Sequence, residues 1–101
     1  MFIKVADILI RKEDVYSIEC YDRKTMIHTD VGDIITTDTI CSTVGQFDNR
    51  LICVYRGIFV NPKYFKRVYK DRIVMTNDSV FYISRRRYPE VIDHLLEYRN
   101  K

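Results

Sequence analysis

The 101-residue sequence has the length of one domain, and because 47% of its residues are hydrophobic it can bury a single core. It has no apolar run of about twenty residues and no apolar signal core, so we expect no transmembrane helix and place the protein in the cytoplasm. The net charge of +3 is uneven: residues 1–49 hold 5 Lys/Arg against 9 Asp/Glu and residues 50–101 hold 12 against 5, so the second half either attracts a polyanion or forms a solvated basic surface.

The first half reads as short strands with a period of two. The expected strands are residues 2–5, 8–11, 15–20, 25–29 and 34–37. Strict alternation in the third strand puts Val15, Ser17 and Glu19 on one side. Asp38 or Thr39 can then cap a short helix through about residue 44, which Gly45 is expected to end.

The second half continues as strands and closes with a helix. The expected strands are residues 51–60, interrupted at Arg56-Gly57, then 67–70, 73–76 and 80–83. A helix is expected near Pro89, with Val91, Ile92, Leu95 and Leu96 as its apolar stripe. Residues 85–87 are either its first turn or a loop before it, since Pro89 disfavours helical geometry at the preceding residue.

Eight or nine short strands and two short helices predict a mainly β fold, and the absence of alternating long helices argues against a parallel sheet. No linker or repeat divides the chain, so residues 1–101 are expected to form a single domain. Cys20, Cys41 and Cys53 are odd in number and contain no Cys-x-x-Cys pair, so we expect reduced, mostly buried thiols rather than disulfides or zinc ligands.

Enzyme signatures are missing from the sequence. His28 and His94 are its two histidines, and neither has a partner at metal-ligand spacing. There is no Gly-x-Ser-x-Gly elbow and no Gly-rich phosphate loop. We therefore expect no enzyme, no cofactor and no metal site.

Basic residues gather where strands end. The first group is Asp22-Arg23-Lys24-Thr25, the second surrounds Arg56, and the third is Ser84-Arg85-Arg86-Arg87. Arginine pairs bidentately with guanine edges or with phosphate oxygens, while Ser, Thr and Tyr supply positioning contacts. Tyr55 and three further basic residues, Lys63, Lys66 and Arg67, lie near these groups in the sequence.

Three segments resemble the LytTR family of DNA-binding domains. Residues 51–61, LICVYRGIFVN, resemble its hallmark Phe-x-Arg-x-His-Arg-Ser-Tyr-hydrophobic-Val-Asn. Residues 15–19, VYSIE, resemble the strand ending in IxxIE, and residues 77–85, NDSVFYISR, resemble its hairpin followed by VSR. The spacings fit without large gaps, so the resemblance covers essentially the whole chain.

The resemblance implies an elongated set of short β-sheets whose loops enter successive major grooves of duplex DNA. The implied contacts are Arg23, Lys24 and Thr25 after the first strand motif, Tyr55 and Arg56 in the hallmark, and Arg85 with Arg86 beside it. We expect Arg56 and Arg85 at base edges. Phosphate contacts are expected from Lys24, Lys63, Lys66, Arg67 and Arg87. The family also implies two copies on repeated half-sites and a fused or partner receiver domain of a two-component response regulator.

Four positions qualify this interpretation. Cys53, Tyr55 and Gly57 stand where the family usually has Arg, His and Ser, which changes the groups available for base readout. Glu19 matches a family residue, and because a carboxylate repels phosphate we expect it to brace a neighbouring Arg or Lys.

Two other functions stay open. A module of the same fold that sequesters a regulator without binding DNA is favoured only by the hallmark substitutions. RNA binding requires exposed aromatic rings for stacking. Tyrosines are available for this, although most of the eight are expected in strand cores; the candidates are Tyr21, Tyr55, Tyr64 and Tyr69.

Overall fold

The computed structural model describes residues 1–99, with side chains described for residues 1–98. Over this range the chain is mainly β, as predicted, with one strand more than the upper expectation. The strands are β1 Phe2–Val5, β2 Ile8–Arg11, β3 Val15–Tyr21, β4 Lys24–Thr29, β5 Gly32–Thr36, β6 Ile52–Tyr55, β7 Ile58–Val60, β8 Phe65–Val68, β9 Arg72–Met75 and β10 Val80–Tyr82. The helices are α1 Ile40–Val44 and α2 Tyr88–Arg99, with 3-10 turns η1 Lys12–Asp14, η2 Gly45–Phe47 and η3 Pro62–Tyr64.

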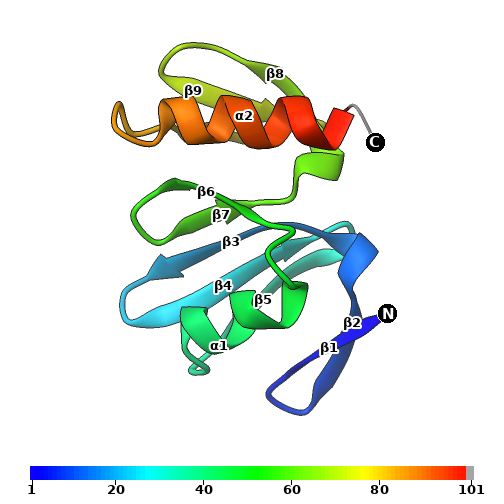
Figure 1. Cartoon of the computed structure of the whole chain (residues 1–101). Coiled ribbons are helices and arrows are strands. Elements are labelled where there is room, and N and C mark those ends of the chain that lie inside the picture. The colour runs from blue at the N-terminus through cyan, green and yellow to red at the C-terminus, as the bar shows by residue number, and fades with distance from the viewer. Residues whose placement is uncertain (100–101) are drawn as a thin grey trace.

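A five-stranded antiparallel sheet in the order β5-β4-β3-β7-β6 forms the centre of the molecule (Figure 1). A two-stranded sheet of β1 and β2 and a three-stranded sheet in the order β10-β9-β8 flank it. The dimensions, 37 × 30 × 23 Å, describe a slightly elongated body. All strand pairs are antiparallel, in keeping with the short connections between them.

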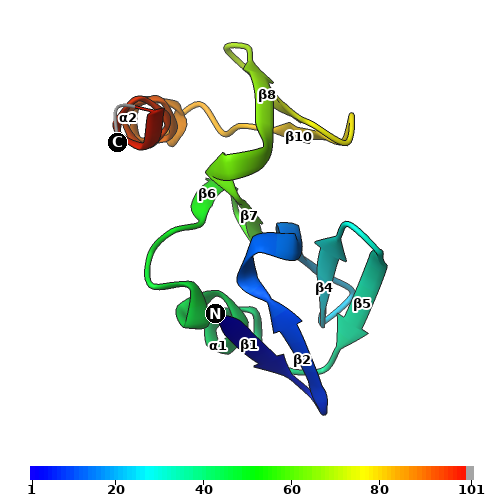
Figure 2. The same ribbon diagram turned by 90° about the vertical axis from the view of Figure 1, so that its right-hand side faces the viewer.

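Both faces of the central sheet are buried, each in its own apolar cluster. Ile18 and Ile27 face the first cluster, which β1, β2 and α1 complete. Val54 and Val60 face the second cluster, formed with α2 and the three-stranded sheet. Figure 2 shows α2 on one side and β8 and β10 on the other, above the β6–β7 hairpin. The central sheet therefore joins the two halves through its own side chains.

The expected alternation of the third strand is wrong at its beginning. Val15 pairs with Thr29 but Ser17 pairs with His28, so Tyr16 is an extra residue, a β-bulge. The bulge turns Val15 and Ile18 to the same face, where both are fully buried. Glu19 consequently lies on the opposite face, toward the second cluster.

The predicted short helix is confirmed: α1 ends at Val44 with Gly45 as its C-cap, and a separate 3-10 turn follows. The Thr39 hydroxyl accepts a hydrogen bond from the Ser42 N–H at 3.1 Å and caps α1, as expected for this position. Gly45 has a helical φ of −58°, and the chain continues as η2. The left-handed residues that end this segment are Asp48 and Asn49, at φ 53° and 65°.

The final helix begins after a turn formed by residues 85–87. The Ser84 hydroxyl accepts a hydrogen bond from the Arg87 N–H at 3.2 Å, and the Ser84 carbonyl accepts one from the Tyr88 N–H at 3.1 Å. Val91 and Leu95 are buried as predicted, whereas Leu96 is exposed. No helix in the described part of the chain is long and apolar enough to cross a membrane.

Two glycines with opposite conformations allow a paired stability test. Gly57 has φ +75°, and a Cβ built on it would lie 3.4 Å from the Cys20 Cβ, whereas a Cβ on helical Gly45 meets nothing within 4 Å. We expect Gly57→Ala to lower the free energy of unfolding by about 1 kcal/mol, since left-handed geometry penalises a side chain. Gly45→Ala should raise it by about 0.5–1 kcal/mol through the lower entropy of the unfolded chain. Urea denaturation followed by circular dichroism measures both, and equal effects of the two substitutions would contradict the assignment.

Candidate nucleic-acid interface

The first basic turn is a two-residue hairpin loop. Tyr21 pairs with Lys24 across the end of β3 and β4, leaving only Asp22 and Arg23 between the strands. Both have positive φ, 51° and 64°, as a type I′ hairpin turn requires. Arginine rarely adopts this geometry. The fold therefore holds Arg23 in a costly conformation at the tip of the turn, fully exposed to a partner.

The second basic turn joins β6 and β7. Tyr55 pairs with Ile58, so Arg56 and Gly57 form the whole connection. The positive φ of Gly57, +75°, favours glycine at this position of the turn. Tyr55 is 46% exposed and Arg56 is exposed beside it.

The third basic turn precedes α2 and contains Arg85, Arg86 and Arg87. Arg85 and Arg86 are exposed, and Arg87 is half-buried. Burial raises the pKa of the Cys53 thiol, and the nearby positive charge of Arg87 opposes this effect, which places Arg87 close to β6. The amino end of α2 adds its partial positive charge at the same place.

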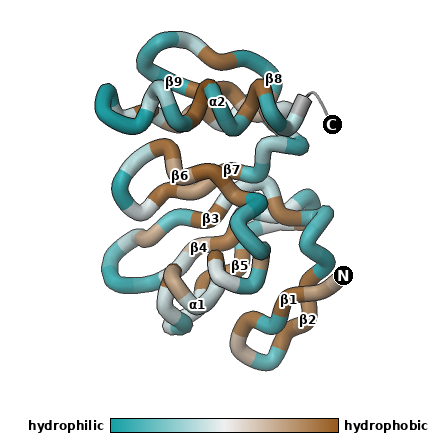
Figure 3. The backbone as a smooth tube through the Cα atoms, in the orientation of Figure 1, coloured by the Kyte–Doolittle hydropathy of each residue, from teal (hydrophilic) through white to brown (hydrophobic). Residues whose placement is uncertain are grey.

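Backbone hydrogen bonds hold the three turns in one row. The Cys20 N–H donates to the Gly57 carbonyl at 2.8 Å, joining the first turn to the second. The Ser84 N–H donates to the Val54 carbonyl at 2.9 Å, joining the second turn to the third. In Figure 1 all three turns lie on the left side of the molecule, and Figure 3 shows hydrophilic residues in each. We call this row the basic rim, defined by Arg23, Lys24, Tyr55, Arg56, Arg85, Arg86 and Arg87.

The cations of the rim are not neutralised by neighbouring carboxylates. Ion pairs elsewhere engage Arg11 with Asp14, Lys12 with Asp48 and Arg72 with Asp71. Among the side chains of residues 1–98, no rim cation forms such a pair. The rim thus presents uncompensated positive charge, which attracts a polyanion.

Thr25 departs from the sequence expectation. Its side chain is 2% exposed, and its hydroxyl donates to the Asp38 carbonyl at 2.7 Å. A contact with DNA through this side chain would require breaking the hydrogen bond and opening the first apolar cluster. We therefore omit Thr25 from the candidate interface.

Lys63 and Lys66 lie at the other end of the strands. The Asn61 N–H donates to the Tyr16 carbonyl at 2.8 Å, which places η3 beside the start of β3. The seven residues of β3 separate this end from the rim by about 20 Å. Lys66 pairs there with Asp78 at 3.3 Å. Arg67, on the edge strand β8, is exposed between the two ends.

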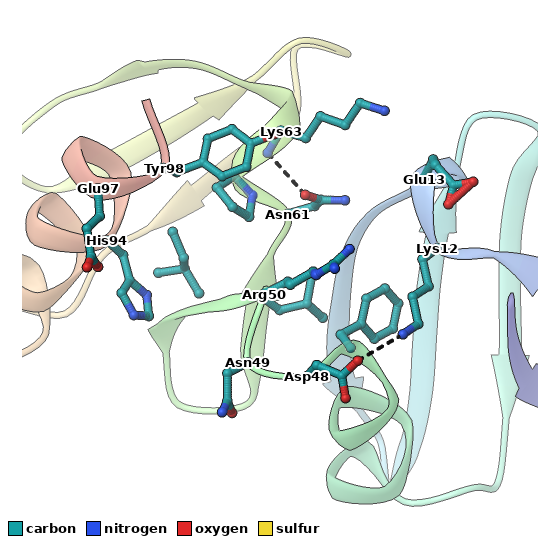
Figure 4. A pocket seen from close by; sticks show the side chains of 14 residues that line it. Lys12, Glu13, Asp48, Asn49, Arg50, Asn61, Lys63, His94, Glu97 and Tyr98 are labelled. Atoms are coloured by element: carbon teal, nitrogen blue, oxygen red, sulfur yellow. Dashed lines mark hydrogen bonds and ion pairs between the residues drawn. The ribbon is translucent and has the colours of Figure 1, made fainter. Parts of the chain in front are cut away.

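A cleft of about 580 Å³ occupies the end of the molecule that holds Lys63 (Figure 4). Its cationic residues Lys12, Arg50 and Lys63 are matched by the carboxylates of Glu13, Asp48 and Glu97. This balance gives the cleft no preference for an anion. Within the described residues, no group of three or more His, Cys, Asp or Glu is arranged to hold a metal ion.

Comparisons with known proteins identify the family and the fold. The family model of the LytTr DNA-binding domain matches residues 6–96. The chain belongs to the LytTR family. A solved structure, the LytTr DNA-binding domain of a putative methyl-accepting/DNA response regulator from Bacillus cereus, superposes with a TM-score of 0.75 at 20% identity, over 95% of this chain and 94% of that one. None of the curated proteins compared with the chain matches it significantly.

Membership of the LytTR family establishes DNA binding in transcription regulation as the general role of the chain. The family match identifies neither the DNA sequence nor the side chains that read it. Those finer assignments depend on the geometry of the rim.

The sequence analysis missed one turn near the rim, because it placed Lys70 at the end of a strand. β8 ends at Val68 instead, and residues 69–71 form the turn to β9. The Ile83 N–H donates to the Asp71 carbonyl at 2.8 Å, so exposed Lys70 lies beside the third basic turn. The charged triplet of residues 70–72 between two apolar stretches is the sequence signal that could have identified this turn.

Two expectations about buried side chains are wrong. Cys20 and Cys41 are exposed and Cys53 is half-buried, and none of the three belongs to either apolar cluster. The exposed tyrosines are also more numerous than expected, namely Tyr21, Tyr55, Tyr69, Tyr82 and Tyr98. Among the described side chains Glu19 contacts no Arg or Lys, and its carboxylate contacts His28 instead.

The strain at Arg23 predicts a gain of stability on mutation. Arg23→Gly should raise the free energy of unfolding by about 0.5–1 kcal/mol, because relief of about 1–2 kcal/mol of left-handed strain exceeds the entropic cost of glycine. Lys24→Gly, one residue later within β4, is the matched control and should lower it by about 0.5–1 kcal/mol. Thermal or urea unfolding measures both, and a loss of stability in Arg23→Gly would show that the turn is not strained.

Proposed function

We propose that this LytTR domain recognises a specific duplex DNA sequence by placing side chains of the basic rim into the major groove, with two copies occupying successive major grooves. The observation that carries the proposal is the pair of hydrogen bonds, Cys20 to Gly57 and Ser84 to Val54, that align three basic turns. A rim crossing about four strand spacings, roughly 15–20 Å, exceeds the width of one major groove, about 12 Å. Successive major grooves on one face of the duplex lie one helical turn, roughly 34–36 Å, apart, so one rim reaches a single major groove with its flanking backbone.

Five of the seven rim residues are assigned separate parts in recognition. Arg56 and Arg85, at the tips of the second and third turns, are assigned to base edges, since a guanidinium pairs bidentately with guanine. Lys24 and Arg87 are assigned to phosphates, together with the N–H groups at the start of α2. Tyr55 can donate a hydrogen bond to phosphate or stack on a sugar or base.

Two lysines that the sequence analysis assigned to phosphate contacts lie far from the rim. Lys63 and Lys66 lie about 20 Å from the rim, at the far end of β3, and Lys66 is paired with Asp78. In contrast to the sequence expectation, we propose that neither contacts the duplex bound at the rim. Arg67, between the two ends, is assigned to a flanking phosphate.

The assembly on DNA follows from the size of one rim. Half-sites of dimeric DNA-binding proteins lie roughly 34–36 Å apart, which one rim does not span. We propose that two copies occupy repeated half-sites, one rim at each. The structure from Bacillus cereus belongs to a response regulator; by analogy we propose that a fused or partner receiver domain delivers the signal to this domain.

Selection of bound duplexes from a random pool supplies the binding site and tests the proposal directly. We expect enrichment of a sequence repeated about one helical turn apart. Binding to the selected duplex should weaken linearly in a plot of log K against log salt. Failure to enrich any sequence, with no salt-dependent binding, would favour the protein-interaction module instead. Preference for single-stranded RNA over duplex DNA would favour RNA binding.

Substitutions at the two ends of the molecule separate the assignments. Arg85→Ala should cost about 1–3 kcal/mol on the selected duplex and much less on random DNA. Lys24→Ala should weaken binding to both duplexes equally and lower the salt slope by about one. Lys63→Ala is the matched control and should leave both affinities unchanged. Fluorescence anisotropy at several salt concentrations measures these effects, and equal losses from Arg85→Ala and Lys63→Ala would reject the rim.

A further inference from the structure

His28 lies between two carboxylates on the central sheet. It is on β4, and its Nε2 lies 2.6 Å from Glu19 Oε2 on β3. Its Nδ1 lies 2.8 Å from Asp33 Oδ1 on β5, the residue directly opposite it in the strand register. The Phe81 ring of β10 covers the imidazole from the other sheet, with 6.4 Å between ring centroids.

This arrangement requires a proton on each ring nitrogen. An ionised carboxylate only accepts hydrogen bonds, and a neutral imidazole has one N–H to donate. Both short contacts are therefore hydrogen bonds when the ring is an imidazolium. Burial disfavours the charged ring, but the hydrogen bonds to Glu19 and Asp33 outweigh this, and the pKa of His28 is raised above its usual value.

The histidine is connected to the basic rim through Glu19. Glu19 pairs with Ile58, the residue after Gly57, and precedes Tyr21 at the first turn by two residues, about 7 Å along the strand. Glu19 thus lies next to the rim, and its charge acts on a duplex bound there to an extent that salt screens, with a Debye length of about 10 Å at 0.1 M. A positive ring at His28 offsets this negative charge, and a neutral ring leaves it opposing the phosphates.

We propose that His28 is a positioning residue for DNA binding, which holds Glu19 away from the phosphates and couples the binding of duplex DNA to the uptake of a proton. The inference rests on the proposed function of the rim. The charged groups that face the ring are Glu19 from β3 and Asp33 from β5, while β10 contributes the uncharged Phe81. Phosphates brought near this group by DNA favour the positive ring, so the complex holds the proton more tightly than the free domain.

The same geometry fixes the direction of the pH dependence of stability. The folded protein holds the proton more tightly than the unfolded chain, so this contribution to stability is fully present below the unfolded pKa, about 6.5. It is lost as the pH rises through the raised folded-state pKa. DNA affinity should fall over the same alkaline range, by about threefold for each half unit by which DNA raises the pKa.

The two histidines of the chain provide a matched experiment. The probe is a fluorescein-labelled duplex recovered from the random pool, with its affinity measured from pH 6 to 9 at constant salt. Wild type and His94→Gln should lose affinity about threefold or more between pH 6.5 and 9. His28→Gln, which keeps hydrogen-bonding groups but no charge, should bind weakly with a flatter profile. His28→Lys, a permanent cation, should restore affinity at high pH.

An NMR titration of the wild-type histidine rings keeps the test independent of any folding defect in the variants. It should show a His28 pKa raised above its usual value in the free domain and a higher value in the complex. An unchanged His28 pKa on binding, or a pH profile in His28→Gln as steep as in wild type, would overturn the inference while leaving DNA binding intact. Absence of duplex binding at every pH would instead overturn the proposed function and this inference together.

Discussion

The arrangement of the candidate interface depends on two backbone hydrogen bonds, from Cys20 to Gly57 and from Ser84 to Val54. They connect turns that are far apart in the sequence and belong to different parts of the fold. Turns of two residues have little freedom of their own, so the strands determine where their side chains lie. Because both faces of the central sheet contribute to apolar clusters, its strands anchor the ends of the two hairpin turns, and we expect binding to require little ordering of these loops.

Much of the fold was predictable from local patterns. The hairpin of β1 and β2, the interruption at Arg56-Gly57 and the cap of α1 follow from alternation, turn residues and helix-capping chemistry. Sequence periodicity gave wrong predictions where tertiary contacts determine which side chains are buried. Nothing in residues 15–20 marks Tyr16 as a bulge, since the partner strand sets the register. Leu96 continues an apolar stripe but lies beyond the sheet that the stripe covers.

The sequence predicts which residue types form the candidate site, but not which individual residues belong to it. By charge and residue type, Lys63 is as good a candidate as Arg56 or Arg85. Only the strand directions show that Lys63 lies at the other end of the molecule. Thr25 follows two exposed basic residues, yet alternation turns its side chain inward to Asp38. Conversely, the significance of Glu19 depends on His28, nine residues away, and the diagonal contact between them exists only in the folded sheet.

The extra residue at Tyr16 has an evolutionary consequence. One inserted residue exchanges the two faces of the strand that follows it, so Ile18 is buried with the first cluster and Glu19 is directed toward His28. A relative that lacks the insertion keeps both features only if every later polar and apolar position of the strand is interchanged. A sequence alignment that places a gap here from residue similarity alone therefore assigns buried residues to exposed positions and exposed residues to buried ones. A deletion at this point would therefore need several accompanying substitutions to keep the same core.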